Sequence, residues 1–218
     1  NDDKFACASE LKALLPYLEN RDLDIEAIQD YLTYMWCPGE GTPFKEVRKL
    51  LPGSFLKIDL NDVSQTENVR YYKLKFPEKL LDNKPIEVWM DDLEQKLMAA
   101  VKRQLLSDAP IGFFFSVGLA SSLLVATARK LFPDHKLKCY TIDSGESKDG
   151  FSNDLHYARK VAKHLDIELV EIKVDSSLVD IVDKMIWYLH EPESDPAPFN
   201  AYKIAERARK AGIKVVIG

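Results

Sequence analysis

The stretch Ile111–Ser122, IGFFFSVGLASS, decides the fold of this chain. Its apolar run Ile111–Phe115 is typical of a buried parallel strand. A turn of small residues follows at 116–118, and Ser121 begins the run SSLLVATARKLF, which predicts a helix. The first N–H groups of a helix have no partner within it, and the helix dipole adds positive charge at that end. A strand that enters a helix through a tight turn therefore predicts an anion-binding site.

Hydroxyl groups add to this predicted site, because Ser116, Ser121 and Ser122 lie in or beside the turn. The stretch differs from a Walker loop, since no Gly-Lys-Ser/Thr sequence follows it. A strand–turn–helix junction that binds no ligand is the alternative interpretation.

The chain after residue 110 alternates strands and helices. Four strands separated by helices predict an α/β fold with a right-handed, doubly wound parallel sheet. Such sheets bind ligands beyond the carboxyl ends of their strands, at the switch point of the strand order, and the turn at Ser116 lies at one such end. The predicted strands are 111–115, 137–142, 168–174 and 213–217, and the predicted helices are 121–131, 153–165, 177–189 and 199–211.

Residues 1–76 mix short elements before a polar, proline-bounded linker at 75–85. The linker leads into a long amphipathic helix predicted over 86–106. The chain has no initiator Met, and its last apolar run ends on Gly218, so we expect a fragment of a longer protein. The elements predicted before the linker are a strand at 5–9, a short helix at 10–18, a helix at 24–34 capped by Asp24, and paired strands at 55–60 and 69–74.

Composition excludes several classes of function. A formal net charge of −5 argues against a nucleic-acid partner held through its phosphates, and the sequence has no apolar run long enough for a membrane span. Cys7, Cys37 and Cys139 are far apart and lack metal-binding spacing, which predicts reduced, buried thiols in a cytoplasmic protein. The four histidines are scattered, and no metal site is predicted among them.

An acidic turn comes late in the chain, with Glu191, Glu193 and Asp195 close together. A solvated turn is the preferred interpretation, with a metal site as the alternative.

The loop at 116–122 resembles SGGLDSS, the pyrophosphatase loop of the asparagine synthetase family. Val117 stands where that loop has a glycine, and Ala120 stands where it has an aspartate. A β-branched residue at 117 costs about 1–3 kcal/mol if the turn requires a positive φ there. Further stretches follow the order of the family: Ala8–Leu14 (ASELKAL), Asp24–Leu32, Thr42–Phe44 (TPF), Leu51–Gly53 (LPG), Cys139–Ile142 with 153–165, Glu191–Pro192, and Ile213–Gly218.

The resemblance implies a fold and a division of the chain. Residues 110–218 would form a truncated ATP-pyrophosphatase synthetase domain of the adenine nucleotide α-hydrolase-like fold. Residues 1–76 would be the C-terminal remnant of an α+β glutaminase-like domain of the Ntn type, and 77–109 the linker and connecting helix.

The resemblance also implies an ATP site. The backbone of Phe115 would lie near the adenine or ribose, Ile142 would contact the adenine, and Gly218 would begin a loop that faces the pyrophosphate. The family aspartate helps to hold Mg²⁺, so ATP and Mg²⁺ are the expected cofactors, yet Ala120 supplies no metal ligand and no catalytic residue is assigned. Asp154 lies near a family acidic position, although its place at a helix N-terminus explains it equally well. The residues expected to hold the pyrophosphate are Ser116, Gly118, Ser121 and Ser122.

The implied activity is that of an ATP-dependent amidotransferase. It would adenylate the side-chain carboxylate of aspartate, or of a related acid, for attack by ammonia from glutamine. The glutaminase would need an N-terminal cysteine as nucleophile, and residue 1 is Asn, so that half is absent from the chain. The expected partners are small-molecule substrates, and a homodimer is compatible with the resemblance. A degenerate nucleotide-binding or scaffold member, and a lactam-forming synthetase relative, stay open as alternatives.

Overall fold

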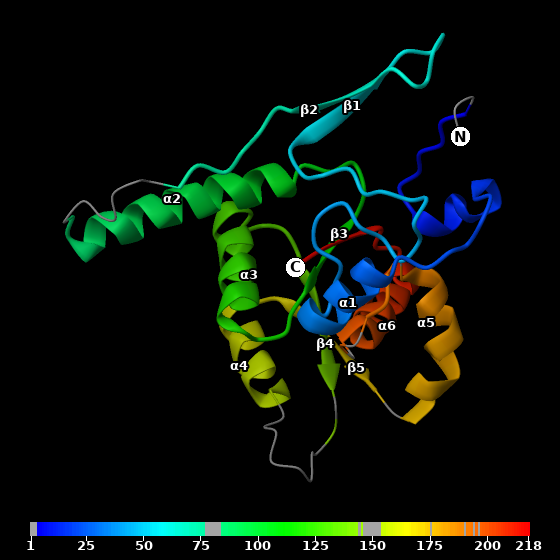
Figure 1. Ribbon diagram of the computed structural model, residues 1–218. Coiled ribbons are helices and arrows are strands. Elements are labelled where there is room, and N and C mark those ends of the chain that lie inside the picture. Colours follow the sequence, from blue (N-terminus) through cyan, green and yellow to red (C-terminus); the bar gives the residue numbers. More distant parts are fainter. Residues whose placement is uncertain are drawn as a thin grey trace. The chain divides into compact units, whose positions relative to one another are not determined.

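The computed structural model describes residues 4–76, 84–143, 145, 154–174, 176–189, 191–193, 195 and 197–218 (Figure 1). The chain forms two compact units. The first contains Asn1–Leu80 and Val182–Asp195, and the second contains Leu81–Ile181 and Pro196–Gly218. The first unit is therefore discontinuous in sequence.

A four-stranded parallel sheet forms the centre of the second unit. Its strands are β3 (Ile111–Phe114), β4 (Lys138–Asp143), β5 (Glu168–Lys173) and β6 (Val215–Ile217). They lie in the order β5-β4-β3-β6, and every neighbouring pair is parallel. The chain moves outward from β3 to β5 and then returns to the other side of β3, so the strand order reverses between β3 and β6.

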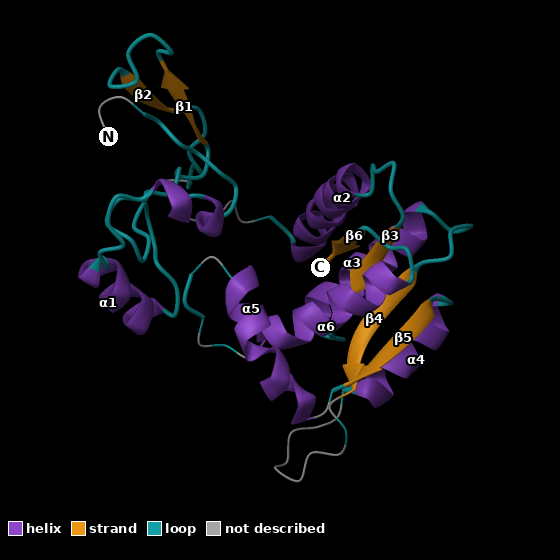
Figure 2. Ribbon diagram, turned by 90° about the vertical axis from the view of Figure 1, so that its right-hand side faces the viewer, coloured by secondary structure: helices purple, strands orange, loops and turns teal. Residues whose placement is uncertain are grey.

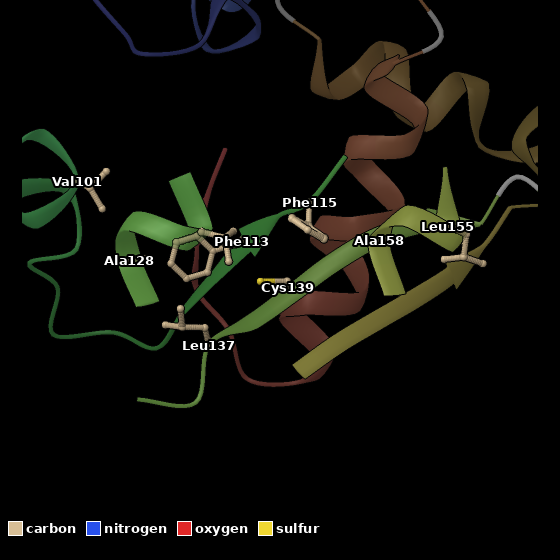
Figure 3. Close-up of a cluster of buried hydrophobic side chains, with 9 residues drawn as sticks. Val101, Phe113, Phe115, Ala128, Leu137, Cys139, Leu155 and Ala158 are labelled. Carbon is tan, nitrogen blue, oxygen red and sulfur yellow. The ribbon is translucent and has the colours of Figure 1, made fainter. Parts of the chain in front are cut away.

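Helices cover both faces of this sheet, with α4 and α6 on opposite sides (Figure 2). On one face, Phe113, Phe115 and Cys139 are buried against apolar residues of α2, α3 and α4 (Figure 3). On the other face, Tyr140 packs against α6. Successive strand residues point to opposite faces, which places Cys139 and Tyr140 in different cores. The α/β, doubly wound parallel fold is confirmed, with helices α2 (Ile86–Gln104), α3 (Leu119–Leu131), α4 (Leu155–Leu165) and α6 (Ala197–Lys210).

Two helices after residue 110 differ from the prediction. Helix α3 begins at Leu119, because Gly118 takes the extended N-cap conformation (φ −61°, ψ 161°), so Ser121 lies in the first turn. The helix predicted over 177–189 is instead a 3₁₀ helix (Ser176–Ile181) followed by α5 (Val182–Tyr188), and the change coincides with the boundary between the units. Residue 153, the predicted start of the next helix, lies outside the described residues.

Among the described residues, the first unit contains helices α1 and α5, two short 3₁₀ helices and one two-stranded sheet. Helix α1 (Ile25–Tyr34) is capped as predicted, since the side chain of Asp24 accepts the N–H groups of Glu26 and Ala27 at 3.1 and 3.2 Å. Strands β1 (Ser54–Ile58) and β2 (Thr66–Arg70) pair antiparallel, which confirms the predicted pairing, but the second strand ends at Arg70 and shares only two residues with the predicted strand at 69–74.

The N-terminal predictions of the first unit are wrong in two places. Residues 5–9 form no strand in the structure, and a strand without a neighbour leaves its backbone groups unpaired. The helix predicted at 10–18 is replaced by two short 3₁₀ helices, Leu11–Ala13 and Leu15–Tyr17. Pro16 has no N–H to donate and so disfavours a continuous helix.

All three cysteines are free, and they differ in exposure. Cys37 is buried in the first unit and Cys139 in the second, whereas Cys7 is exposed, so the prediction of buried thiols is wrong for Cys7. Burial raises the pKa of the Cys139 thiol to about 12. This thiol is therefore protonated at neutral pH and unreactive while the unit is closed.

No helix in the described part of the chain is long and apolar enough to span a membrane.

Candidate functional site

The loop at 116–122 leaves the sheet at the carboxyl end of β3, beside the point where the strand order reverses. The N–H of Phe115 donates to the carbonyl oxygen of Tyr140 at 2.8 Å, which extends the pairing of β3 with β4 by one residue. Phe115 is also only 1% exposed. The loop therefore begins at a strand end that is held by pairing and burial. Ser116 is the first residue beyond the part of β3 that pairs with β4.

Val117 lies in the left-handed region of the backbone map, with a φ of 65°. This is the positive φ on which the expected cost depended, so the β-branched residue there costs about 1–3 kcal/mol of strain. The Val117 side chain is half-buried and packs against the core that contains Phe113 and Phe115. This packing offsets part of the strain.

Two serine hydroxyls and a carbonyl meet at the N-terminus of α3. The Oγ atoms of Ser116 and Ser121 lie 3.2 Å apart, and Ser121 Oγ donates to the carbonyl oxygen of Gly118 at 3.2 Å. The N–H of Ser122 donates to the same carbonyl oxygen at 3.0 Å. Hydroxyl groups rotate to suit their partners, so these serines can redirect their protons toward an anion. The arrangement presents O–H donors beside the free N–H groups of a helix N-terminus.

The ends of the neighbouring strands lie level with this loop. Gly218 follows β6, and a Cβ atom on it would lie 3.1 Å from Cβ of Phe114, so its backbone approaches β3 closely. Because Phe114 pairs with Tyr140, Ile142 lies two residues further along β4, level with Ser116. The seven residues expected at an ATP site thus gather at one edge of the sheet. Their part in binding stays a prediction.

Asp143 is an acidic residue at this edge that the sequence prediction missed. It is half-buried at the end of β4, and its Oδ1 accepts the N–H of Gly145 at 3.0 Å. The predicted strand ended at Ile142, which left Asp143 unassigned. An aspartate directly after a buried apolar strand was the available signal.

A bidentate ion pair lies beside Asp143 and joins α4 to β5. Nε and Nη2 of Arg159 donate to the two carboxylate oxygens of Glu171 at 2.7 and 2.6 Å. The hydrogen bonds from Arg159 hold the pKa of the Glu171 carboxyl below its usual range, and the charge of Asp143 acts in the opposite direction.

The residues of the loop do not fit Mg²⁺. Ala120 is exposed in the first turn of α3, and no acidic side chain lies in that turn. Mg²⁺ binds through carboxylate oxygens, and alanine offers none. Within the described ranges, no group of three or more His, Cys, Asp or Glu side chains could hold a metal ion.

The acidic turn belongs to the first unit, and the prediction that it is solvated is wrong for Glu191. The carboxylate of Glu191 is half-buried, lies 2.6 Å from Nζ of Lys49, and accepts the N–H of Cys37 at 3.3 Å. Glu193 is exposed and accepts the N–H of Asp195 at 3.2 Å.

Comparisons with known proteins identify two family models along the chain. The model described as asparagine synthase matches residues 92–218, and the glutamine amidotransferase domain model matches residues 1–72. The first match contains the whole loop and the strands that surround it.

Relatives align with nearly the whole chain. It is 28% identical over 214 residues to "Asparagine synthetase [glutamine-hydrolyzing] 1" of Bacillus subtilis, and the alignment covers 96% of this chain and 32% of the relative. It is 31% identical over 191 residues to the asparagine synthetase of Pongo abelii, which covers 81% and 34%. It is 26% identical over 228 residues to "Amidase chyE" of Penicillium rubens, which covers 98% and 33%.

The chain spans about a third of the length of these curated relatives. Among solved structures, it resembles a U34-tRNA thiolase of Methanococcus maripaludis with a TM-score of 0.43 and 17% identity, covering 63% of this chain and 47% of that one. The family assignment rests on the sequence matches, since the asparagine synthase model alone matches more than half of the chain. The chain belongs to the asparagine synthase family.

Proposed function

We propose that this chain supplies the nucleotide-binding region of an ATP-dependent amidotransferase of the asparagine synthetase type. The observation that carries the proposal is the Ser116–Ser122 loop, whose hydroxyls and helix N-terminus lie at the switch point of a parallel sheet in a member of this family. Ligands of such sheets bind at that point.

Each residue of the site has a role in the proposal. Ser116, Ser121 and Ser122, with the backbone at Gly118, bind the β- and γ-phosphates. The backbone of Phe115 and the side chain of Ile142 lie on the nucleoside side. Gly218 begins the segment that faces the pyrophosphate.

In the proposed reaction, a side-chain carboxylate oxygen of aspartate, or of a related acid, attacks the α-phosphorus of ATP. The bond from that phosphorus to the bridging oxygen breaks, and pyrophosphate leaves. Ammonia then attacks the acyl carbon of the adenylate, and AMP leaves with its oxygen to give the amide. The donors at the start of α3 stabilise the negative charge that gathers on the departing pyrophosphate. No step is assigned to Mg²⁺, because the loop offers it no ligand.

The proposal also covers the organisation of the protein. Residues 1–76 belong to a glutaminase-like domain that would supply ammonia from glutamine, 77–109 connect it, and 110–218 belong to the synthetase domain. The match of the glutamine amidotransferase model to residues 1–72 supports this division. We further propose that the protein is cytoplasmic and forms a homodimer. It acts on small-molecule substrates and has no nucleic-acid partner.

The test uses the full-length protein with ATP, aspartate, and either glutamine or ammonium. We expect formation of AMP and pyrophosphate that depends on the acid. Ser121→Ala should lower the apparent affinity for ATP several-fold, because one donor to the phosphates is lost. Ser107→Ala is the matched control, since the exposed Ser107 hydroxyl also donates to a nearby carbonyl oxygen, at 3.1 Å, but lies outside the site. A protein that neither binds ATP nor releases pyrophosphate contradicts the proposal.

Ala120 and the strained Val117 favour a second candidate, a member that binds nucleotide without adenylating an acid. Such a protein would bind ATP but form no AMP, and Val117→Gly combined with Ala120→Asp should then restore release of pyrophosphate. A lactam-forming relative would instead act on a carboxylated amino acid without ammonia.

A further inference from the structure

We infer that the Ser116–Ser122 loop binds the pyrophosphate part of a nucleotide without a metal ion held by the loop. The inference rests on the proposed function, because it assumes that nucleotide binds at this loop. The loop departs from the family loop at Val117 and Ala120, and the departure that concerns the metal is Ala120, which stands where the family loop has the aspartate that helps to hold Mg²⁺.

The polar side chains of the loop are hydroxyls, and none of its side chains is acidic. Its donors are the hydroxyls of Ser116 and Ser121 and the free N–H groups at the start of α3, and the first turn carries no acidic side chain. A carboxylate at position 120 would repel a bare polyphosphate and attract its magnesium complex. Ala120 does neither, so the side chains of the loop offer hydroxyl donors and no negative charge to a bare polyphosphate.

Asp143 does not restore a metal site. Its Oδ1 accepts the N–H of Gly145 at 3.0 Å. Its negative charge acts to raise the pKa values of both Arg159 and Glu171. It belongs to no group of acidic, histidine or cysteine side chains, among the described residues, that could enclose a cation.

Binding of ATP and of pyrophosphate to the full-length protein tests the inference, measured by isothermal titration calorimetry in EDTA and in excess MgCl₂. We expect both ligands to bind in EDTA at least as tightly as in MgCl₂. Ala120→Asp should weaken binding in EDTA by roughly five- to tenfold and make binding depend on Mg²⁺.

Two control variants separate charge from position. Ala120→Asn adds the same volume without the charge. Leu119→Asp adds the charge one residue earlier, about 100° around the helix, at a side chain that is 87% exposed. Neither control should make binding depend on Mg²⁺.

The outcomes are distinct. Binding of the unaltered protein that requires Mg²⁺ overturns the inference and leaves the proposed nucleotide site standing. Absence of ATP and pyrophosphate binding under both conditions overturns the proposed function and the inference with it.

Discussion

Val117 combines strain and packing in a single residue, and substitution can separate the two. An L-residue in the left-handed region costs about 1–2 kcal/mol relative to glycine, whereas glycine is normally less stable than alanine. We therefore expect Val117→Gly to be more stable than Val117→Ala by about 1 kcal/mol, because alanine loses the packing but keeps the positive φ. Chemical denaturation of both variants measures the difference.

Val125 provides the reference for this comparison. It is fully buried in α3, where glycine should be less stable than alanine by about 1 kcal/mol. If the glycine and alanine variants rank in the same order at positions 117 and 125, the strain assigned to Val117 is absent.

Tyr140 carries a buried hydroxyl with no hydrogen-bond partner among the described residues. An unsatisfied polar group costs about 1–3 kcal/mol, so Tyr140→Phe should raise the free energy of unfolding by about 1 kcal/mol. Urea denaturation tests this, with Tyr157→Phe as the control because the side chain of Tyr157 is exposed. A loss of stability in Tyr140→Phe would show that the hydroxyl is satisfied.

The positions of most expected site residues could be predicted from their neighbours in the sequence. The serines and Gly118 follow directly from a strand that enters a helix, so neighbouring residues suffice to locate them. Asp143 was not predicted as a site residue because its position depends on where β4 ends. Pairing with β5 extends that strand through Asp143.

The contact of α4 with β5 includes the Arg159–Glu171 pair, and it should make stability depend on pH. The folded-state pKa of Glu171 lies below its ordinary value of 4.5, so the folded state binds fewer protons than the unfolded state. The contribution is therefore present above about pH 4.5 and is lost as the pH falls through the folded-state pKa.

Glu171→Gln should accordingly lower the thermal midpoint slightly at neutral pH. The difference from the unaltered protein should shrink on acidification and in high salt, because the pair is partly exposed. Thermal melts across this pH range measure it, with Glu168→Gln as the comparison on the same strand. A difference that is constant from neutral to acidic pH would contradict the role of the carboxylate.

Apolar periodicity predicted the long helices and every strand of the parallel sheet. It failed where partners decide the structure. Residues 5–9, predicted as a strand, pair with no strand among the described residues, and the run 177–189 is divided between two units. Neither cause is visible in a local window of sequence.

The first unit includes Val182–Asp195, a segment distant in sequence from the rest of the unit. Glu191 bonds this segment to residues of the N-terminal part of the unit. The carboxylate pairs with Lys49 at 2.6 Å and accepts the N–H of Cys37 at 3.3 Å, while Lys49 also donates to the Cys37 carbonyl oxygen. Glu191→Gln should lower the opening free energy of this segment by about 1.5–3 kcal/mol, since hydrogen bonds to charged groups contribute that much.

Hydrogen exchange measures the effect as faster exchange of amides in 182–193, and Glu193→Gln is the control because Glu193 is exposed. Equal exchange in the two variants would show that Glu191 does not hold the segment. No sequence pattern indicated this attachment, because it joins residues 142 positions apart.

The three free cysteines give the molecule its own reporters of motion. A thiol-alkylating reagent modifies Cys7 at the rate of an accessible thiol, whereas it reaches Cys37 only when the first unit opens and Cys139 only when the second does. Mass spectrometry of timed alkylation therefore yields the opening rate of each unit from one sample of the unaltered protein. The alkylation rate of Cys7 is the internal reference for an accessible thiol.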